Sequence, residues 1–412
     1  MKRVVIVASG QSYRTGDFVR AAELLQVEPL VATDMTPPVP GSQLQVDLSD
    51  PESAAQAISS VVPPPDAVVA IDDQGVEVAA RASQRLGLVA NPVEAAEATR
   101  DKIVMRQLLA DAGVPQPSFA PAGVGEVPEV AGAMGFPAVV KPAGLSASRG
   151  VIRVDDAAAA RRTEKRIRKM LKIGELDSNQ PLLVEEYLPG TEVVVEGLLI
   201  DGGLRSLAVI DKPDPLEGPF FEETMLVTPS RLPEGVQRAS IDLATDGAGA
   251  LGLGHGPVHA EVRVHPDGSV KLLEVAARSI GGLCGRALSF GLLGESLEVM
   301  VLRSALGMPT RDTAPARPAT GVLMLPIPAT GILSGIDGID EVMAMEGIDD
   351  VTLTIAAGRR IEALPEGDRY LGFVFAGGVD ADAVEATLRR AGSGLTVMVD
   401  GEEMHKPVAP GD

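Results

Sequence analysis

Two glutamates, Glu261 and Glu274, lie in adjacent apolar stretches that are joined by a turn. Glu261 belongs to HAEVRV and Glu274 to VKLLEVA, and the intervening HPDGS carries the Asp-Gly pair that is typical of hairpin turns. A two-residue loop and a four-residue loop give the same register, which places Glu261 opposite Glu274 and His259 opposite Ala276. The residues expected on the buried face are Ala260, Val262, Val264, Leu273 and Val275.

Two carboxylates that face each other across a strand pair repel and destabilise it unless a cation lies between them. Mg²⁺ suits such a site because it binds one or two carboxylates together with nucleotide phosphates and water. An exposed acidic strand face is the alternative, and the hairpin alone favours it in a chain with 57 acidic residues.

A lysine at the end of an apolar strand, Lys141 in AVVKPAGLSASRGV, strengthens the interpretation as a binding site. The loop that follows is rich in glycine and serine, whose backbone N–H groups can point into a concavity that suits anions. The lysine adds a compact charge for phosphate. A flexible surface hairpin would explain the glycines and serines but not the lysine, and the loop lacks the GKS or GKT of a Walker A motif.

The stretch LLVEEYLPGTEVVVEG is predicted to form two strands joined by a short Pro-Gly turn, with Glu185, Glu186 and Glu192 around it. Unpaired backbone groups of such a connector can bind the edge of a purine, and a nearby carboxylate can hold ribose hydroxyls. Solvated acids that flank a turn are the more common explanation of this pattern when it occurs alone.

Composition limits the class of protein. The 412 residues are enough for two to four domains, and 45% of them are hydrophobic, but only 3% are aromatic, which predicts aliphatic cores. The net charge of -21 argues against nonspecific binding to nucleic acids or anionic membranes. Cys284 is the only cysteine, so no internal disulfide can form, and nothing near it in the sequence activates it as a nucleophile. The apolar run in MKRVVIVASG is too short for a signal peptide, and these features predict a soluble cytoplasmic protein.

Strands and helices alternate near the N-terminus, which predicts βαβ units on a parallel sheet, although no GxGxxG follows the first strand. Further along, a compact α+β module, a hairpin region and a Gly-punctuated C-terminal segment follow, and GMPTRDTAPARPA has the composition of a linker. We therefore expect an α/β and α+β chain with four units, at 1–95, 96–195, 196–310 and 311–412.

In their order and spacing these features resemble the ATP-grasp superfamily of carboxylate–amine ligases. Within it, the chain is most similar to the L-amino acid ligases that form dipeptides, through GHGPVHAEVRV, EVAARSIGG, FFEETMLVTPS and the tail around YLGFVFAGG. The resemblance implies an ATP-grasp fold: an N-terminal Rossmann-like domain, a small subdomain with its linker helix, a large subdomain with the metal site, and a small C-terminal α/β domain.

The resemblance also implies a role for individual residues. Those that match ATP-binding positions are Lys102 and Lys141 for the phosphates, Ser146, Ser148, Arg149 and Gly150 for the closing loop, Glu185 with the backbone of Glu186 and Leu188 for adenine, and Glu192 for ribose. Glu261 and Glu274 match the magnesium carboxylates, but Ala276 stands where most of the superfamily has a metal-binding Asn. Arg278 matches the arginine that steadies the acyl phosphate and the substrate carboxylate, and Glu223 resembles the acid that receives the substrate amino group. His259 and Gly281 would line the substrate pocket.

The implied reaction begins with attack of a substrate carboxylate on the γ-phosphate of ATP, which gives an acyl phosphate and ADP. An amine, expected to belong to a second amino acid, then forms the amide and releases phosphate. The implied cofactors are ATP and one or two Mg²⁺ ions, with Mn²⁺ as an alternative. The expected partners are small molecules, with no nucleic acid and no membrane, and the resemblance suggests a homodimer.

Two other functions stay open. One is a different ATP-grasp carboxylate ligase, or a carboxylase-like enzyme of purine-type metabolism. The other is a non-catalytic nucleotide-binding protein, against which the presence of both lysines, both carboxylates and Arg278 argues.

Overall fold

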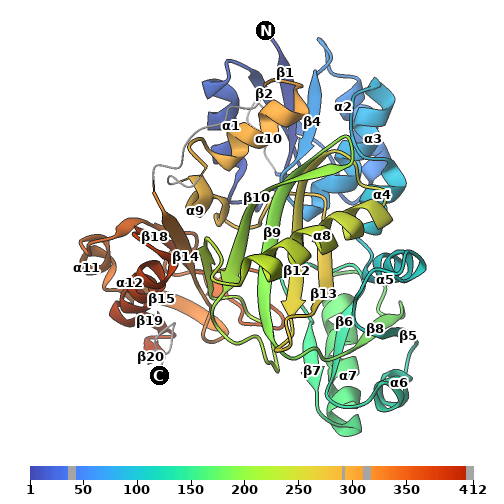
Figure 1. Ribbon diagram of the computed structural model, residues 1–412, viewed down its shortest axis with the longest axis vertical. Coiled ribbons are helices and arrows are strands. Elements are labelled where there is room, and N and C mark those ends of the chain that lie inside the picture. Colours follow the sequence, from blue (N-terminus) through green and yellow to red (C-terminus); the bar gives the residue numbers. More distant parts are fainter. Residues whose placement is uncertain (36–42, 290–292, 310–316, 405–412) are drawn as a thin grey trace.

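The computed structural model describes residues 1–35, 43–289, 293–309 and 317–404, and in this part of the chain helices pack on four β-sheets (Figure 1). The N-terminal sheet is parallel, in the order β3-β2-β1-β4, as the alternation of strands and helices predicts. Its strands are β1 (Arg3–Val7), β2 (Glu28–Thr33), β3 (Gln43–Gln45) and β4 (Ala67–Ala70), and its helices are α1 (Thr15–Leu24), α2 (Pro51–Ser59) and α3 (Val76–Leu86), with a 3₁₀ turn at Asp73–Gly75.

Two short helices, α4 (Val93–Ala98) and α5 (Lys102–Asp111), lead into a small antiparallel sheet. Asp101 caps α5 by accepting hydrogen bonds from the N–H groups of Ile103 and Val104, which fixes Lys102 at the first helical position. The small sheet has the order β5-β8-β6-β7. It consists of β5 (Phe119–Ala122), β6 (Ala138–Pro142), β7 (Ile152–Val154) and β8 (Leu182–Glu186), with α6 (Val127–Met134) and α7 (Ala157–Ile173) packed on it.

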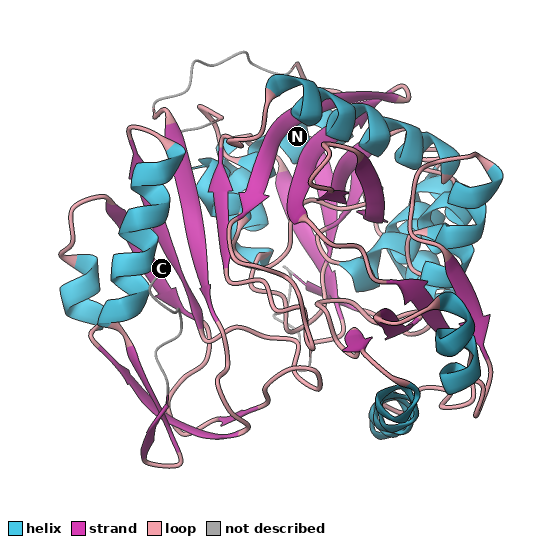
Figure 2. Cartoon of the chain, turned by 60° about the horizontal axis from the view of Figure 1, so that its bottom comes forward, coloured by secondary structure: helices cyan, strands magenta, loops and turns pink. Residues whose placement is uncertain are grey.

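The large antiparallel sheet has the order β13-β12-β9-β10-β11-β14-β18-β16, and its strands lie side by side through the middle of the molecule (Figure 2). The pairing of β11 with β14 joins the third predicted unit to the fourth in one continuous sheet. The boundary predicted between 195 and 196 falls inside β9, and the boundary between 310 and 311 lies outside the described residues, as does most of the predicted linker. The strands are β9 (Thr191–Ile200), β10 (Gly203–Lys212), β11 (Met225–Thr228), β12 (Gly256–Val264), β13 (Val270–Ala276), β14 (Ala319–Leu325), β16 (Ile348–Leu353) and β18 (Gly372–Gly378).

The hairpin of β12 and β13 confirms that Glu261 pairs with Glu274 and His259 with Ala276. A β-bulge then shifts the register by one residue toward the turn, so that Val262 pairs with Leu272. The prediction that Leu273 faces the core is therefore wrong: Leu272 is fully buried, and Leu273 lines a cavity instead. A bulge inserts one unpaired residue and reverses the faces beyond it.

A fourth sheet in the described residues has the order β17-β15-β19-β20 and lies at the C-terminal end. It is formed by β15 (Gly331–Asp337), β17 (Arg360–Ile361), β19 (Thr396–Val399) and β20 (Glu402–Met404). The remaining helices are α8 (Glu234–Ala250), α9 (Gly285–Ser289), α10 (Leu297–Ala305), α11 (Ile339–Met343) and α12 (Ala381–Gly394).

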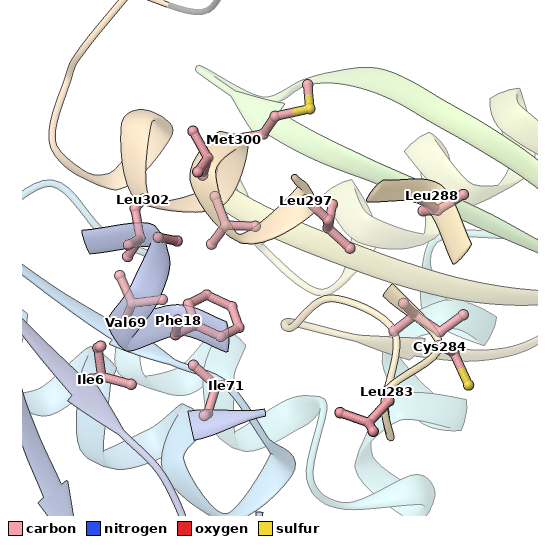
Figure 3. Packing of buried hydrophobic residues seen from close by; sticks show 14 of the residues in the cluster. Ile6, Phe18, Val69, Ile71, Leu283, Cys284, Leu288, Leu297, Met300 and Leu302 are labelled. Atoms are coloured by element: carbon pink, nitrogen blue, oxygen red, sulfur yellow. The ribbon is translucent and has the colours of Figure 1, made fainter. Parts of the chain in front are cut away.

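A hydrophobic cluster, mainly of aliphatic side chains, joins the N-terminal sheet to the segment after β13 (Figure 3). Phe18 and Ile71 pack there with Leu297 and Leu302 of α10, while Leu283 and Cys284 lie at the other end of the cluster. This packing fixes the segment between β13 and α9, which begins with Ala277 and Arg278. None of the helices in the described ranges is both long and apolar enough to cross a membrane.

Candidate active site

A cavity of about 340 Å³ lies where the small sheet faces the large sheet, and segments of the N-terminal and C-terminal parts also line it. Its wall contains all the residues predicted for the site except Arg149 and Gly150. Those on the wall are Lys102, Lys141, Ser146, Ser148, Glu185, Glu186, Leu188, Glu192, Glu223, His259, Glu261, Glu274, Arg278 and Gly281. The fold therefore brings them together, and their individual roles remain predictions.

Glu261 and Glu274 lie at facing positions of the hairpin, with side chains that are 26% and 29% exposed. Lys102 Nζ lies 3.3 Å from Glu274 Oε1 and donates a hydrogen bond of 2.8 Å to the carbonyl oxygen of Leu145. Burial raises the pKa of Glu261, but the ammonium of Lys212 and the hydrogen bond from His259 outweigh burial and lower that pKa overall. Glu261 is therefore ionised at neutral pH.

Lys212, at the end of β10, stands among three glutamates that sequence reasoning assigned to different roles. Its ammonium contacts Glu192 and Glu223 closely and lies 3.5 Å from Glu261. Burial lowers the pKa of Lys212, but the three carboxylates raise it well above its usual value. One oxygen from each of these glutamates lies within 4.8 Å of the others, a spacing that could hold a metal ion. Lys212 is in close contact with two of these carboxylates, so a metal ion held by all three would have to displace its ammonium group.

The Glu261–Glu274 pair fits a divalent cation by its chemistry. Two carboxylates on one cavity wall offer the hard oxygen donors that Mg²⁺ and Mn²⁺ prefer. Ala276 also lines the cavity, but its methyl group offers no oxygen. The side-chain oxygen ligands that β12 and β13 present to the cavity are therefore these two carboxylates.

Glu185 is the centre of a buried ion-pair network. It is 3% exposed, and its two oxygens lie 2.6 Å from Arg106 Nε and 2.8 Å from Lys141 Nζ. Burial raises the pKa of Glu185, but Arg106 and Lys141 lower it overall. Both oxygens are thus engaged, and the carboxylate orients Lys141 toward the cavity. Arg106 also donates to the Leu273 carbonyl at 2.6 Å, which ties α5 to β13.

The connector after β8 leaves the backbone N–H of Leu188 available at the cavity wall. Glu186 N–H donates to the Ser118 carbonyl oxygen, and Tyr187 N–H donates to that of Pro137. Leu188 N–H makes no hydrogen bond within the described residues, although Leu188 lines the cavity. This arrangement supports a purine-binding role for Leu188 N–H rather than for the N–H of Glu186.

Arg278 is positioned by Asp73, which sequence reasoning missed. Its Nε and Nη2 atoms each lie 3.0 Å from an oxygen of Asp73, and Nη1 donates to the Ser279 carbonyl oxygen. A guanidinium has five N–H donors, and three of those of Arg278 are used by these hydrogen bonds within the described residues. Two N–H groups of Arg278 are therefore left for a ligand. Burial raises the pKa of Asp73, but Arg278 and Arg100 lower it to about 2, which keeps the pair ionised.

His259 forms a buried pair with Glu196. Its Nδ1 atom lies 3.0 Å from Glu196 Oε2, and the Ile280 N–H donates to the other oxygen of Glu196. Burial lowers the pKa of His259, but Glu196 and Glu261 raise it to about 9. His259 is therefore an imidazolium at neutral pH, fixed beside Glu261, and it is not poised to accept a proton there.

Arg149 and Gly150, which are predicted to belong to the loop that closes over the phosphates, do not line the cavity. Arg149 Nε donates to the Glu366 carbonyl oxygen, and its Nη1 lies 3.5 Å from Asp368. Gly150 N–H donates to the Pro365 carbonyl oxygen. These contacts tie the end of the glycine- and serine-rich loop to a C-terminal segment, so the two residues act as anchors in this structure, while Ser146 and Ser148 remain on the wall.

Sequence reasoning missed four charged residues that organise the site: Asp73, Arg106, Glu196 and Lys212. The sequence pattern could have indicated Lys212, because this lysine ends an apolar strand in LAVIDK just as Lys141 ends AVVK. Asp73 also follows an apolar strand, at the end where parallel sheets gather ligands. Arg106 and Glu196 gave no local signal, since their partners are distant in the sequence.

The carboxyl group of Glu222, beside the site, allows a test of how burial affects the stability of the folded protein. Burial raises the pKa of its carboxyl group to about 7, and no cation among the described residues offsets the effect of burial. Because the folded pKa exceeds the unfolded one, ionisation costs stability as the pH rises from about 4.5 to 7. We expect Glu222→Gln to raise the unfolding free energy at pH 8 by up to about 3 kcal/mol and to change little at pH 4.5.

Circular dichroism melts at the two pH values measure this difference. Glu217→Gln, at an exposed position of the same loop, is the matched control and should change stability at neither pH. Equal stabilisation by Glu222→Gln at both pH values would contradict the burial of an ionised carboxylate.

Comparison with known families gives two matches. Residues 134–287 match an ATP-grasp domain, and residues 323–400 match the L-amino acid ligase C-terminal domain 2. The first range holds the phosphate loop, the hairpin and Arg278, and the second covers most of the strands added to the large sheet beyond β11.

Two curated proteins and one crystal structure are also similar to this chain. The protein y4rH of Sinorhizobium fredii is 30% identical over 305 residues, which are 72% of this chain and 61% of that protein. The alanine–anticapsin ligase of Bacillus subtilis is 31% identical over 235 residues, which are 52% of this chain and 49% of that enzyme. The chain thus spans about half to three fifths of the length of these curated relatives. The crystal structure of an L-amino acid ligase from Bacillus licheniformis superposes with a TM-score of 0.80 at 25% identity, over 97% of this chain and 99% of that one.

Proposed function

Since the chain belongs to the ATP-grasp superfamily and carries an L-amino acid ligase C-terminal domain, we propose that it is an ATP-dependent ligase that joins the carboxylate of one amino acid to an amine, expected to be that of a second amino acid. The reaction would pass through an acyl phosphate and release ADP and phosphate. The observation that carries the proposal is that one cavity brings together two lysines, Arg278, a facing pair of carboxylates and an acid suited to an ammonium group.

The lysines would act on the phosphates. Lys102 and Lys141 are buried apart from their cavity-facing ends, and their charges would neutralise negative charge that moves from the γ-phosphate to ADP. Glu185 holds Lys141 in place, so little reorganisation is needed when ATP binds. Leu188 N–H is proposed to bind the adenine edge. Glu192 is proposed to bind ribose, although its oxygens also contact Lys212 and Arg263.

A divalent cation, Mg²⁺ or Mn²⁺, would be held by Glu261 and Glu274 and would neutralise phosphate oxygens. Arg278 and Glu223 would position the substrates. The two remaining N–H groups of Arg278 can bind a substrate carboxylate or the acyl phosphate formed from it. Glu223 can bind the ammonium group of the substrate. Its carboxylate would then contact that group in place of the ammonium of Lys212. We also propose a cytoplasmic location and a homodimer, which follow from composition and resemblance alone.

The test is ADP release with ATP and Mg²⁺ over a matrix of amino acid pairs, with mass spectrometry of the products. We expect ADP release to need an amino acid and to equal the amount of dipeptide formed. ADP release with other carboxylates or bicarbonate, but not with amino acid pairs, would favour a purine-type or carboxylase-like enzyme. No ADP release, despite measurable ATP binding, would favour a nucleotide-binding regulatory protein.

A further inference from the structure

One short segment of the C-terminal part lies against the glycine- and serine-rich loop. It comprises residues 362–370, between β17 and β18, and Asp368 within it lines the cavity. The Gly367 N–H donates to the Ala363 carbonyl oxygen at 3.0 Å, which closes a tight turn. A Cβ at Gly367 would lie 1.9 Å from the Glu362 carbonyl oxygen, so the turn requires glycine. We call residues 362–370 the clasp segment.

The clasp segment holds the end of the glycine- and serine-rich loop. Gly150 N–H donates to the Pro365 carbonyl oxygen at 3.0 Å, and Arg149 Nε donates to the Glu366 carbonyl oxygen at 3.2 Å. Both acceptors are backbone atoms of the tight turn, so the two hydrogen bonds fix the loop relative to the C-terminal part. The serines of the same loop line the cavity.

A bidentate ion pair joins the same turn to α7, which packs on the small sheet. Arg166 in α7 contacts the two carboxylate oxygens of Glu366, through Nε at 2.6 Å and Nη2 at 2.9 Å. Two parallel N–H···O bonds fix the orientation of both groups. Arg166 also stacks on the ring of Phe220 at 5.3 Å, and Phe220 forms a β-bridge with Ile152 of β7. The β7 edge of the small sheet is therefore held by two segments of the other units.

This edge lies away from the covalent connection between the small and large sheets. The chain leaves the small sheet at β8 and passes directly into β9 of the large sheet (Figure 1). In the order β5-β8-β6-β7, strand β6 separates β8 from β7. When two units open about a connection, the edge that is farther from it moves more. Contacts at the β7 edge can therefore control access to the cavity.

The contacts of the clasp segment are suited to repeated opening. The side chains of Arg166 and Glu366 are 45% and 39% exposed, and exposed ion pairs are individually weak. The pair of Arg106 and Glu185, near the connection, is instead buried. A nucleotide has to enter and leave the cavity in each turnover, so contacts that close over it must break easily.

The clasp segment also reaches the N-terminal part of the chain. The Arg369 guanidinium donates a hydrogen bond to the side-chain oxygen of Gln11, in the turn after β1. Gln11 and Asp368 both line the cavity. The segment thus extends along the cavity from the glycine- and serine-rich loop to the N-terminal sheet.

We propose that the clasp segment holds the glycine- and serine-rich loop over the triphosphate of bound ATP, and that Glu366 is a positioning residue that acts through Arg166. The proposal rests on the proposed function, because it needs ATP in the cavity. It gives the L-amino acid ligase C-terminal domain a role in nucleotide retention, since the match over residues 323–400 includes the clasp segment.

Charge-exchange variants test the proposal through the dissociation rate of the fluorescent nucleotide mant-ATP with Mg²⁺, measured by stopped flow with excess ATP. We expect Glu366→Arg to raise this rate at least about threefold, because two guanidinium groups would then repel each other at the β7 edge. Arg166→Glu should raise it in the same way. The double exchange restores an ion pair and should bring the rate back toward that of the unaltered protein.

A carboxylate of the same segment provides the matched control. Glu362 is exposed and lies 3.8 Å from Arg360, so Glu362→Arg should leave the dissociation rate unchanged. An unchanged rate in Glu366→Arg, or no recovery in the double exchange, would overturn the proposal and leave the proposed function standing. Absence of mant-ATP binding to the unaltered protein would overturn the proposed function and the proposal with it.

Hydrogen exchange followed by mass spectrometry tests the same coupling without substitutions. We expect ATPγS with Mg²⁺ to slow exchange in peptides that cover residues 146–151 and 362–370 together, and to leave β20 unchanged. The N–H groups of Gly150 and Gly367 lie in these two peptides, and both donate to carbonyl oxygens of the clasp segment. Slower exchange in the first peptide alone, or in neither, would overturn the proposal.

Discussion

Replacement of Glu274 by glutamine is expected to lower ATP turnover by at least about 100-fold while the protein stays folded. A loss of that size needs about 3 kcal/mol of transition-state stabilisation, which is within the contribution of a metal ion at a transferring phosphoryl group. An amide oxygen is a weaker ligand than a carboxylate, so the site would hold a divalent cation less tightly. The fold should persist, because Glu274 is 29% exposed and Lys102 keeps its hydrogen bond to Leu145.

ADP release and Mn²⁺ binding, the latter measured by electron paramagnetic resonance in the presence of ADP, check this prediction together. Glu403→Gln, at an exposed position of β20, is the control for a lost carboxylate and should change neither readout. Normal ADP release by Glu274→Gln would remove this residue from the metal site. Lost turnover with normal Mn²⁺ binding would point instead to the contact between Glu274 and Lys102.

The hairpin shows how far the sequence could predict this site. The Asp-Gly turn and the alternation of apolar residues determine the register, and the structure confirms Glu261 opposite Glu274. They give no sign of the β-bulge, because an extra residue in one strand leaves each local pattern intact. The sequence pattern consequently predicts Leu273 in the core, whereas in the structure Leu273 lines the cavity.

The strand-end lysines show a second limit. Lys141 stands out in the sequence because a lysine ends an apolar strand there, and Lys212 shows the same pattern in LAVIDK. The sequence does not show which residues pair with the charged groups of the site. Arg278 and Asp73 are 205 positions apart, and Arg106 and Glu185 are 79 apart. Such pairs arise only when separate sheets are brought together, and the continuous sheet through β11 and β14 likewise forms only in the folded chain.

Replacement of Glu185 by glutamine is expected to destabilise the protein by about 3 to 5 kcal/mol, the usual result when one partner of a buried ion pair is removed. Glutamine has nearly the same shape but no charge. Arg106 and Lys141 would then remain buried, with side chains 1% and 8% exposed, without their carboxylate. The folded-state pKa of Glu185 is lowered, so its stabilising effect is present above the unfolded pKa and is lost as the pH falls.

The neighbouring residue provides a matched control for this prediction. Glu186 pairs with Lys271, but those side chains are 29% and 33% exposed, so Glu186→Gln should cost less than about 1 kcal/mol. Urea unfolding followed by circular dichroism at pH 7 compares the two variants, and the gap between them should shrink toward pH 4. Equal losses at pH 7 would mean that the Glu185 network does not depend on its buried charge. Because Glu185 also orients Lys141, the KM for ATP should rise in Glu185→Gln and not in Glu186→Gln, which links the stability of this network to the binding of phosphate.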